Sequence, residues 1–153
     1  MNAVKAGIDN NALIILGDQR MDITYQRLGK AMSQIDRKAL EELDSKLNEV
    51  VKAQVPEIEE WEKEGKRIRP KQVREFVESM KTVDTTSKMM EVFKKEIPAV
   101  WKAMVGERDA VMARNLNALP SQLETVVAVM GLGHLNGVKR HLQSKGWKVL
   151  SLQ

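Results

Sequence analysis

Short apolar runs near both ends of the chain are the clearest pattern in the sequence. Ala12–Leu16 (ALIIL) is closed by a Gly-Asp pair, and Thr125–Met130 (TVVAVM) leads into a glycine-rich turn. A continuous apolar run bounded by turn residues is typical of a strand that is buried on both faces. The pattern therefore predicts a strand, a turn and a helix at each place, and then a helix over Leu135–Ser144 followed by a strand over Trp147–Leu152.

The middle of the chain, from about Arg37 to Leu119, shows helical rather than strand-like periodicity. Asp84 is the predicted N-cap of one helix, and Pro98 is expected in the first turn of the next. The apolar stripes recur at spacings of three and four residues, and they comprise Leu40, Leu43, Leu47, Val50 and Val51, then Val73, Phe76, Val77 and Met80, then Met89, Met90, Val92 and Phe93. The predicted fold is α/β: one domain over residues 1–153, with a small, mainly parallel sheet and a helical insertion over residues 37–119.

Composition narrows the classes of function. The chain has no cysteine, which excludes disulfides and thiolate zinc sites, and no apolar run is long enough to cross a bilayer. A formal net charge of +4 permits contact with phosphates without requiring it. No aromatic residues alternate with the basic cluster Lys63, Lys66, Arg67, Arg69, Lys71 and Arg74, so a solvated loop is expected there rather than a specific nucleic-acid site.

A histidine follows the second apolar run. His134 stands within Gly131–Gly137 (GLGHLNG), where the predicted strand ends and a helix begins, a place at which open α/β folds bind ligands. A neutral histidine there is suited to accept a proton or bind a metal, and it is equally suited to cap the helix or fill a gap. The glycines also approximate a dinucleotide-binding motif, and this alternative is disfavoured because the following strand offers no carboxylate for a ribose. His141 lies too far along the same helix to share a metal with His134.

An arginine interrupts an apolar helical stripe. Continuing the spacing from Trp101 and Val105 places Arg108 on the inward face, where an arginine needs a partner. The neighbouring Glu107 and the Asp18 that follows the first apolar run are the candidates. Two interpretations stay open, a structural ion pair at the rim of the core and a polar site shared with His134.

Three blocks of sequence resemble the TraB domain family, which contains the bacterial pheromone-shutdown proteins and is more remotely similar to Tiki, GumN and erythromycin-esterase-like proteins. The blocks are ALIILGDQRMDITYQR, which ends at Arg27, MVGERDAVMARNL, which contains Glu107 and Arg108, and VVAVMGLGHLNG, which contains His134. The resemblance implies an α/β fold and a site built from the histidines of two Gly-x-x-His motifs with acidic and arginine residues. Metal-dependent proteolysis is attached to that site in Tiki-like members, whereas regulatory and organelle-contact roles are suggested for TraB proteins.

The resemblance also indicates which residues form the expected site and which residue of the family's site is replaced. His134, Arg108 and Glu107 are the expected catalytic residues, and Asp18, Arg20, Arg27, Gly131 and Gly133 are further candidates. The family's arginine after Gly-Asp is replaced by Gln19, with Arg20 one place later.

The family's first Gly-x-x-His motif and the glutamate that follows it are absent, so the domain is expected to be incomplete at its N-terminus. His134 alone predicts weak metal binding; no cofactor is required by any motif, and a divalent metal is the one candidate. The expected function follows from this incomplete site. It is a TraB-domain regulatory or interaction protein with an incomplete hydrolase-type site, and it is expected to be inactive alone. The alternative is a metal-dependent peptidase or esterase-like hydrolase completed by a partner chain. A protein partner or self-association is expected to cover the missing part, and the expected compartment is intracellular, with an organelle-associated location as one interpretation.

Overall fold

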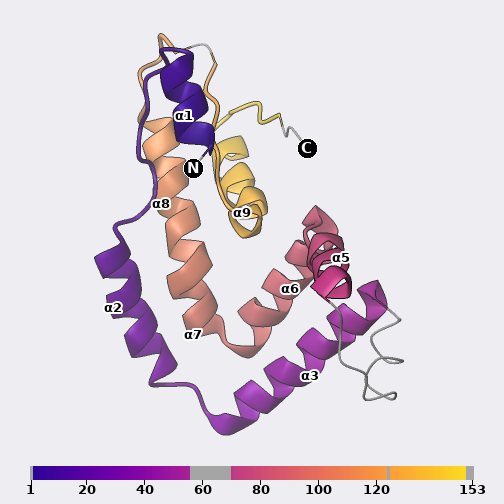
Figure 1. Ribbon diagram of the computed structural model, residues 1–153. Helices are drawn as coiled ribbons and strands as arrows, with labels where there is room; N and C mark the ends of the chain where they lie inside the picture. Colours follow the sequence, from indigo (N-terminus) through magenta and orange to yellow (C-terminus); the bar gives the residue numbers. More distant parts are fainter. Residues whose placement is uncertain (1, 56–69, 124, 151–153) are drawn as a thin grey trace.

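The computed structural model describes residues 2–55, 70–123 and 125–150, which form helices joined by turns and extended segments (Figure 1). Part of the basic cluster lies outside these ranges, namely Lys63, Lys66, Arg67 and Arg69. The elements are α1 (Asn2–Asp9), α2 (Met21–Met32), α3 (Arg37–Gln54), α5 (Pro70–Met80), α6 (Val83–Glu96), α7 (Pro98–Trp101), the π-helical turn η1 (Lys102–Gly106), α8 (Glu107–Asn117) and α9 (Leu132–Gln143).

The predicted parallel sheet is wrong, because the described residues contain no strand. Residues 12–16, 125–130 and 147–150 run without regular structure, and residues 151 and 152 of the third predicted strand lie outside the described chain. A strand exists only where another extended backbone pairs with it. Here the neighbours of these segments are helices; for example, the side-chain amide of Asn115 on α8 donates to the carbonyl oxygen of Gly17 at 2.8 Å.

Side-chain caps mark where two helices of the middle region begin. Asp36 accepts a hydrogen bond from the backbone N–H of Ala39 at 2.7 Å and so caps α3. At the start of α6 the cap is Thr82, whose hydroxyl accepts from the N–H of Thr85, and the predicted cap Asp84 lies inside the first turn. The region is therefore a helical assembly, not an insertion into a sheet.

One helical rod runs from Pro98 to Asn117 and changes its winding in the middle. Pro98 opens α7, as its sequence position predicts, because its fixed φ suits the first helical turn. The π-helical turn η1 then carries one extra residue before α8 begins. Gly106 ends this turn, and a side chain there would collide with the ring of Trp101. The Trp101 ring therefore packs directly against the backbone of Gly106, at the point where the π-helical turn returns to an α-helix.

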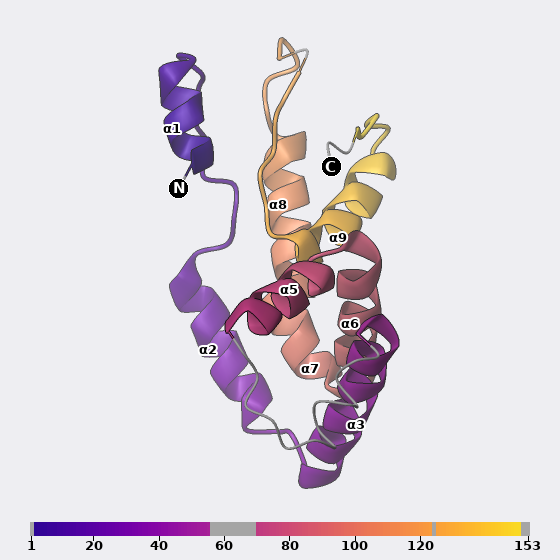
Figure 2. The same cartoon turned by 45° about the vertical axis from the view of Figure 1, so that its right-hand side comes forward.

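Two separate apolar clusters hold the helices together. The first joins α8 and α9 through buried Met112, Ala113, Val138 and Leu142. The second joins α2, α3, α6 and α7, with Ile97 and Val100 among its buried members. Figures 1 and 2 both show α8 beside α9 and α3 beside α6.

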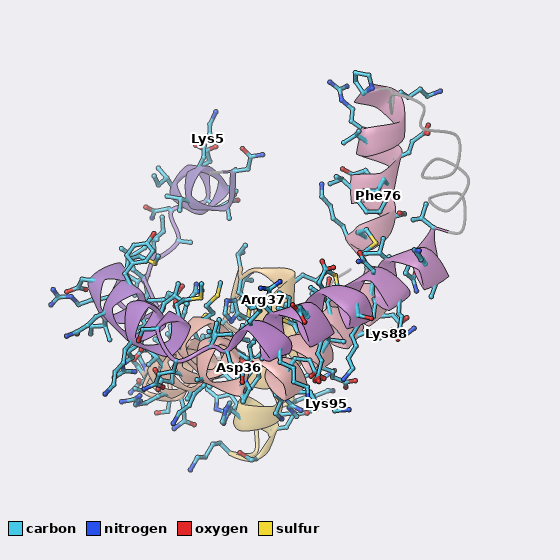
Figure 3. The ribbon with its side chains drawn as sticks, turned by 90° about the horizontal axis from the view of Figure 1, so that it is seen from below. Lys5, Asp36, Arg37, Phe76, Lys88 and Lys95 are labelled. Atoms are coloured by element: carbon cyan, nitrogen blue, oxygen red, sulfur yellow. The ribbon has the colours of Figure 1, made fainter. Side chains whose placement is uncertain are left out.

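Two helices extend away from this assembly. Seen from below, α1 with Lys5 and α5 with Phe76 stand out as separate arms, whereas Lys88 and Lys95 mark α6 alongside α3 (Figure 3). The clusters at the centre, rather than these arms, position the candidate site.

Candidate functional site

A glycine on α9 allows α8 and α9 to approach closely. Gly137 is buried, and a Cβ atom at this position would overlap the carboxylate of Asp109 on α8. The next residue, Val138, is only 1% exposed and belongs to the cluster between the two helices. Because no side chain stands at Gly137, the Asp109 carboxylate reaches the surface of α9.

The buried Asp109 carboxylate holds His134. Its Oδ1 atom lies 2.7 Å from Nδ1 of His134, and the two side chains are only 4% and 12% exposed. With the carboxylate accepting, Nδ1 carries a proton, and in the neutral ring the lone pair of Nε2 is left free. No described residue bonds Nε2. A histidine held in one tautomer by a carboxylate is arranged to accept a proton or to coordinate an ion through its other nitrogen.

His134 lies inside the first turn of α9, since that helix begins at Leu132, three residues before the predicted start. The backbone N–H of His134 donates to the carbonyl oxygen of Gly131 at 2.9 Å. All three glycines of the motif lie close to side chains: Gly131 beside the His134 ring, Gly133 beside the sulfur of Met90 and Gly137 beside the carboxylate of Asp109. The motif therefore packs closely, and His134 does more than cap the helix.

Arg108 pairs with Asp18, as the sequence position of the two residues suggests. Its Nη2 and Nε atoms donate to the two carboxylate oxygens at 2.6 and 3.1 Å, and Nη1 donates to the carbonyl oxygen of Met104. This two-pronged bond lowers the pKa of Asp18, and a weaker electrostatic contribution comes from His134. The same bond raises the pKa of Arg108. His134 thus influences Asp18 only through charge, when its ring is protonated, and it bonds neither Asp18 nor Arg108.

A second arginine pair lies near Asp18. Arg27 of α2 donates to Glu107 at 2.5 Å, so both residues are engaged with each other. Gln19 stands where the resemblance places an arginine; its amide donates to the hydroxyl of Thr24 at 2.9 Å, and its oxygen accepts a longer bond from Arg27. These side chains, with Asp18, line an open hollow of about 480 Å³.

Arg20 does not take the place of the missing family arginine in the contacts of the site. It pairs with Asp22 at 2.8 Å, and both side chains lie largely in solvent, 79% and 62% exposed. An exposed pair between neighbouring residues contributes little to stability. Arg20 borders the hollow but bonds none of the other candidate residues.

The residues present do not fit a protein-bound metal ion by themselves. Within the described ranges, no three His, Asp or Glu side chains come together in a way that could hold one. A catalytic zinc is usually held by three protein ligands, and His134 with Asp109 offers two groups that already bond each other. We therefore assign no chemistry in this chain to a metal.

Asp109 is the site residue that the sequence reasoning missed. It directly follows Glu107 and Arg108 in the block MVGERDAVMARNL, yet it is 3% exposed and makes the bond to His134. A usable signal was present in Gly137. A glycine inside an otherwise regular helix often marks a close approach of another group, and here that group is the Asp109 carboxylate.

Comparison with known sequences gives one family and one relative. The model of the TraB/PrgY/gumN family matches residues 2–150. An uncharacterized protein of Methanocaldococcus jannaschii is 34% identical over 61 residues, which span 40% of this chain and 15% of that protein. The matched segment is thus a small part of the relative's length. No solved structure matches the chain. Among the described helices, none combines the length and the apolar character that a membrane span needs.

Proposed function

Because the chain belongs to the TraB/PrgY/gumN family, we propose that it is an interaction module of that family that self-associates through its extended apolar segments and carries part of a hydrolase-type site. The observation that carries this proposal is the exposure of apolar side chains along these segments. Val127 and Val129 are 77% and 73% exposed, and Leu13 and Leu16 are 77% and 89% exposed.

The helices leave these segments largely uncovered, and every residue of 12–16 is exposed. Met130 and Val149 pack against the α8–α9 cluster, and the Trp147 indole donates to the side-chain oxygen of Asn117 on α8. Residues 127–129 are all exposed, whereas Val126 and Met130 on either side of them are half-buried. An extended segment with apolar side chains on both faces is stable when a second layer covers the outer face. The outer face of residues 126–130 has no such cover in the described chain.

A second copy of the chain is the occupant that we propose. Unpaired extended backbone with apolar side chains is a template for strand pairing, and a second copy supplies the same kind of segment. Each valine that moves from solvent into such a contact contributes about 1.5 kcal/mol. Several apolar residues on each copy are therefore enough to favour pairing over exposure.

The position of the segments links association to the candidate site. Residues 126–130 run directly into the turn that precedes His134, and Leu16 stands two residues before Asp18. A chain paired along these segments lies beside the free Nε2 atom of His134 and the Arg108–Asp18 pair. In our proposal, association therefore controls access to the polar site, which is the regulatory part of the function.

Sedimentation velocity across a range of protein concentrations tests the proposal. The wild-type chain is expected to form dimers as concentration rises, and the Val127→Asp/Val129→Asp variant is expected to remain monomeric because a charge cannot enter an apolar contact without a partner. Tyr25→Asp is the matched control, since Tyr25 is also an exposed large side chain (64%) but lies on α2. A monomeric wild type at every concentration, or an equal effect of Tyr25→Asp, would contradict the proposal.

A metal-dependent peptidase or esterase-like hydrolase, completed by a partner chain, is the second candidate. One observation favours it: a buried carboxylate fixes the ring of His134, an arrangement that also orients histidines in metal sites. The associated species would then cleave peptides in the presence of added zinc or manganese while the monomeric variant would not. Loss of that cleavage in His134→Ala would support the second candidate over a purely binding role.

A further inference from the structure

A second hollow is bordered by Asp109 but not by His134, Arg108 or Asp18. It has a volume of about 120 Å³ and is bordered by α6, α9 and the rod that contains η1. Asn136 of α9 bridges to α6 by donating to the Ser87 hydroxyl at 2.7 Å. Gly133 and Gly137 border this space without side chains, and the Asp109 carboxylate occupies the place of a side chain at Gly137.

Two cations on exposed residues, neither of them paired with a described carboxylate, and one buried N–H without a partner stand around this hollow. The Arg140 guanidinium makes no ion pair with any described residue, and the Lys94 ammonium lies 5.2 Å from the centre of the Trp101 ring rather than on a carboxylate. The indole N–H of Trp101 is buried and has no hydrogen-bond partner. A buried donor without a partner costs free energy unless a bound group supplies an acceptor.

Two carboxylates also line the hollow, and they do not satisfy these donors. Asp109 is already bonded to His134, and Glu91 is exposed and pairs with neither cation. The unmet requirement is therefore for acceptor oxygens that carry negative charge. Glu91 suits a ligand that keeps one proton, because its carboxylate accepts from a hydroxyl group.

Size restricts the ligand further. One water molecule needs roughly 10–15 Å³ of cavity volume. The hollow of about 120 Å³ therefore holds a few waters or one small anion, and it is too small for a nucleoside. Arginine binds the oxygens of phosphate in a two-pronged way, lysine binds them as a point charge, and an indole N–H adds one neutral donor.

We propose that this hollow is a binding site for a small tetrahedral oxyanion, of the phosphate or phosphomonoester class, held by Arg140, Lys94 and the indole N–H of Trp101. The site is distinct from the association surface and does not depend on the function proposed above. Because its ligand contacts both α6 and α9, occupancy stabilises the packing of α6 against α9, the helix that carries His134.

Nuclear magnetic resonance on the full chain tests this site. The indole N–H resonance of Trp101, identified by its loss in Trp101→Phe, is followed during addition of sodium phosphate, with sodium chloride at matched ionic strength as the reference. A saturable shift with phosphate and with sulfate, but not with chloride, is expected. Arg140→Gln should weaken binding at least about tenfold, the loss expected for one charge-assisted contact.

Lys95→Gln is the matched control, because Lys95 is exposed on α6 and does not border the hollow. It should leave phosphate binding unchanged. Circular dichroism spectra of all variants establish that each is folded, and a rise in melting temperature with phosphate gives a second readout. An unmoved Trp101 resonance in saturating phosphate, an equal effect of Lys95→Gln, or an acetate response as strong as that to phosphate would overturn the proposal.

Discussion

The α3–α6 pair and the α8–α9 pair solve the problem of helix packing in different ways. In the first, amphipathic helices pack half-buried apolar side chains around Ala31, Ile97 and Val100 and add an ion pair at the edge, Lys46 to Glu96 at 2.5 Å. In the second, a glycine brings the backbones close, a polar His–Asp pair is buried, and apolar residues of the attached extended segments remain outside.

The difference shows which apolar surfaces are covered by other parts of the same chain and which are not. A helix with one apolar face needs only one neighbour, and α3 and α6 provide it for each other. A segment that is apolar on both faces needs cover on both, and residues 127–129 are all exposed. The apolar faces of α3 and α6 are thus covered within the chain, with α2 and α7 completing the cluster, whereas the segments attached to the α8–α9 pair keep apolar side chains exposed.

The strongest way to break the α8–α9 pair is to fill the space at Gly137. Gly137→Ala is expected to destabilise the fold by about 3 kcal/mol, because the added methyl group displaces the buried Asp109 carboxylate from His134. Urea unfolding measures the loss, and the His134 ring resonances report whether the bond to Asp109 is lost with it.

Gly29→Ala is the matched control for this substitution. Gly29 lies within α2, and no other atom stands near the position of the new methyl group. Alanine there should stabilise the fold by about 0.5–1 kcal/mol, since it loses less backbone entropy on folding. Effects of the same sign at both glycines would show that close approach is not what Gly137 provides.

The α3–α6 pair is tested by removing the charge of Glu96. Its side chain is 6% exposed and receives the Lys46 ammonium, and this bond lowers the pKa of Glu96 and raises that of Lys46. Glu96→Gln should lower the urea midpoint of unfolding by less than Gly137→Ala does, and should leave the contact between His134 and Asp109 unchanged.

Asp84→Asn provides the comparison on the same helix, because its bond to Lys88 is largely exposed. It should change the midpoint less than Glu96→Gln. If the Glu96 variant also disturbed His134, the two helix pairs would be energetically one unit and the contrast between them would fail.

The smallest effect is expected at Asp18. Arg108 holds the pKa of this carboxyl below its ordinary value of 3.8, so the pair adds stability that is fully present above that value and is lost as the pH falls through the lowered pKa. Because Asp18 is 41% exposed, solvent screening limits the gain at neutral pH to about 0.5 kcal/mol.

Asp18→Asn should therefore lower the free energy of unfolding slightly at neutral pH and much less in acid. Asp44→Asn, at an exposed carboxylate on α3 that bonds only the amide of Asn48, is the control. A pH-independent loss in Asp18→Asn would argue against the ion pair as its source.

Helical periodicity predicted the helices well, and the same kind of reasoning failed for the strands. Stripes such as Leu40, Leu43 and Leu47 repeat along one face and need no distant partner to be interpreted. Residues 12–16 and 126–130 have the composition of strands, but strand formation depends on which backbone lies alongside, and that is not a local property of the sequence.

The site was predictable in the same uneven way. The pairing of Arg108 with Asp18 followed from the cost of an unpaired arginine on an apolar stripe. The role of Asp109 did not, because it depends on the rotation of α8 and on the space at Gly137, both of which arise only when two distant helices meet.

The π-helical turn η1 sets that rotation. A single extra residue in a helix turns everything beyond it by about 100° relative to a regular α-helix. In this rod the extra residue precedes Glu107, Arg108 and Asp109, so all three acquire their directions from it. Shortening Lys102–Gly106 by one residue would leave each side chain of α8 intact but aim the carboxylate of Asp109 away from His134 and the guanidinium of Arg108 away from Asp18. The one extra residue of this turn thus determines which side chains of α8 face α9 and which face the segment that contains Asp18.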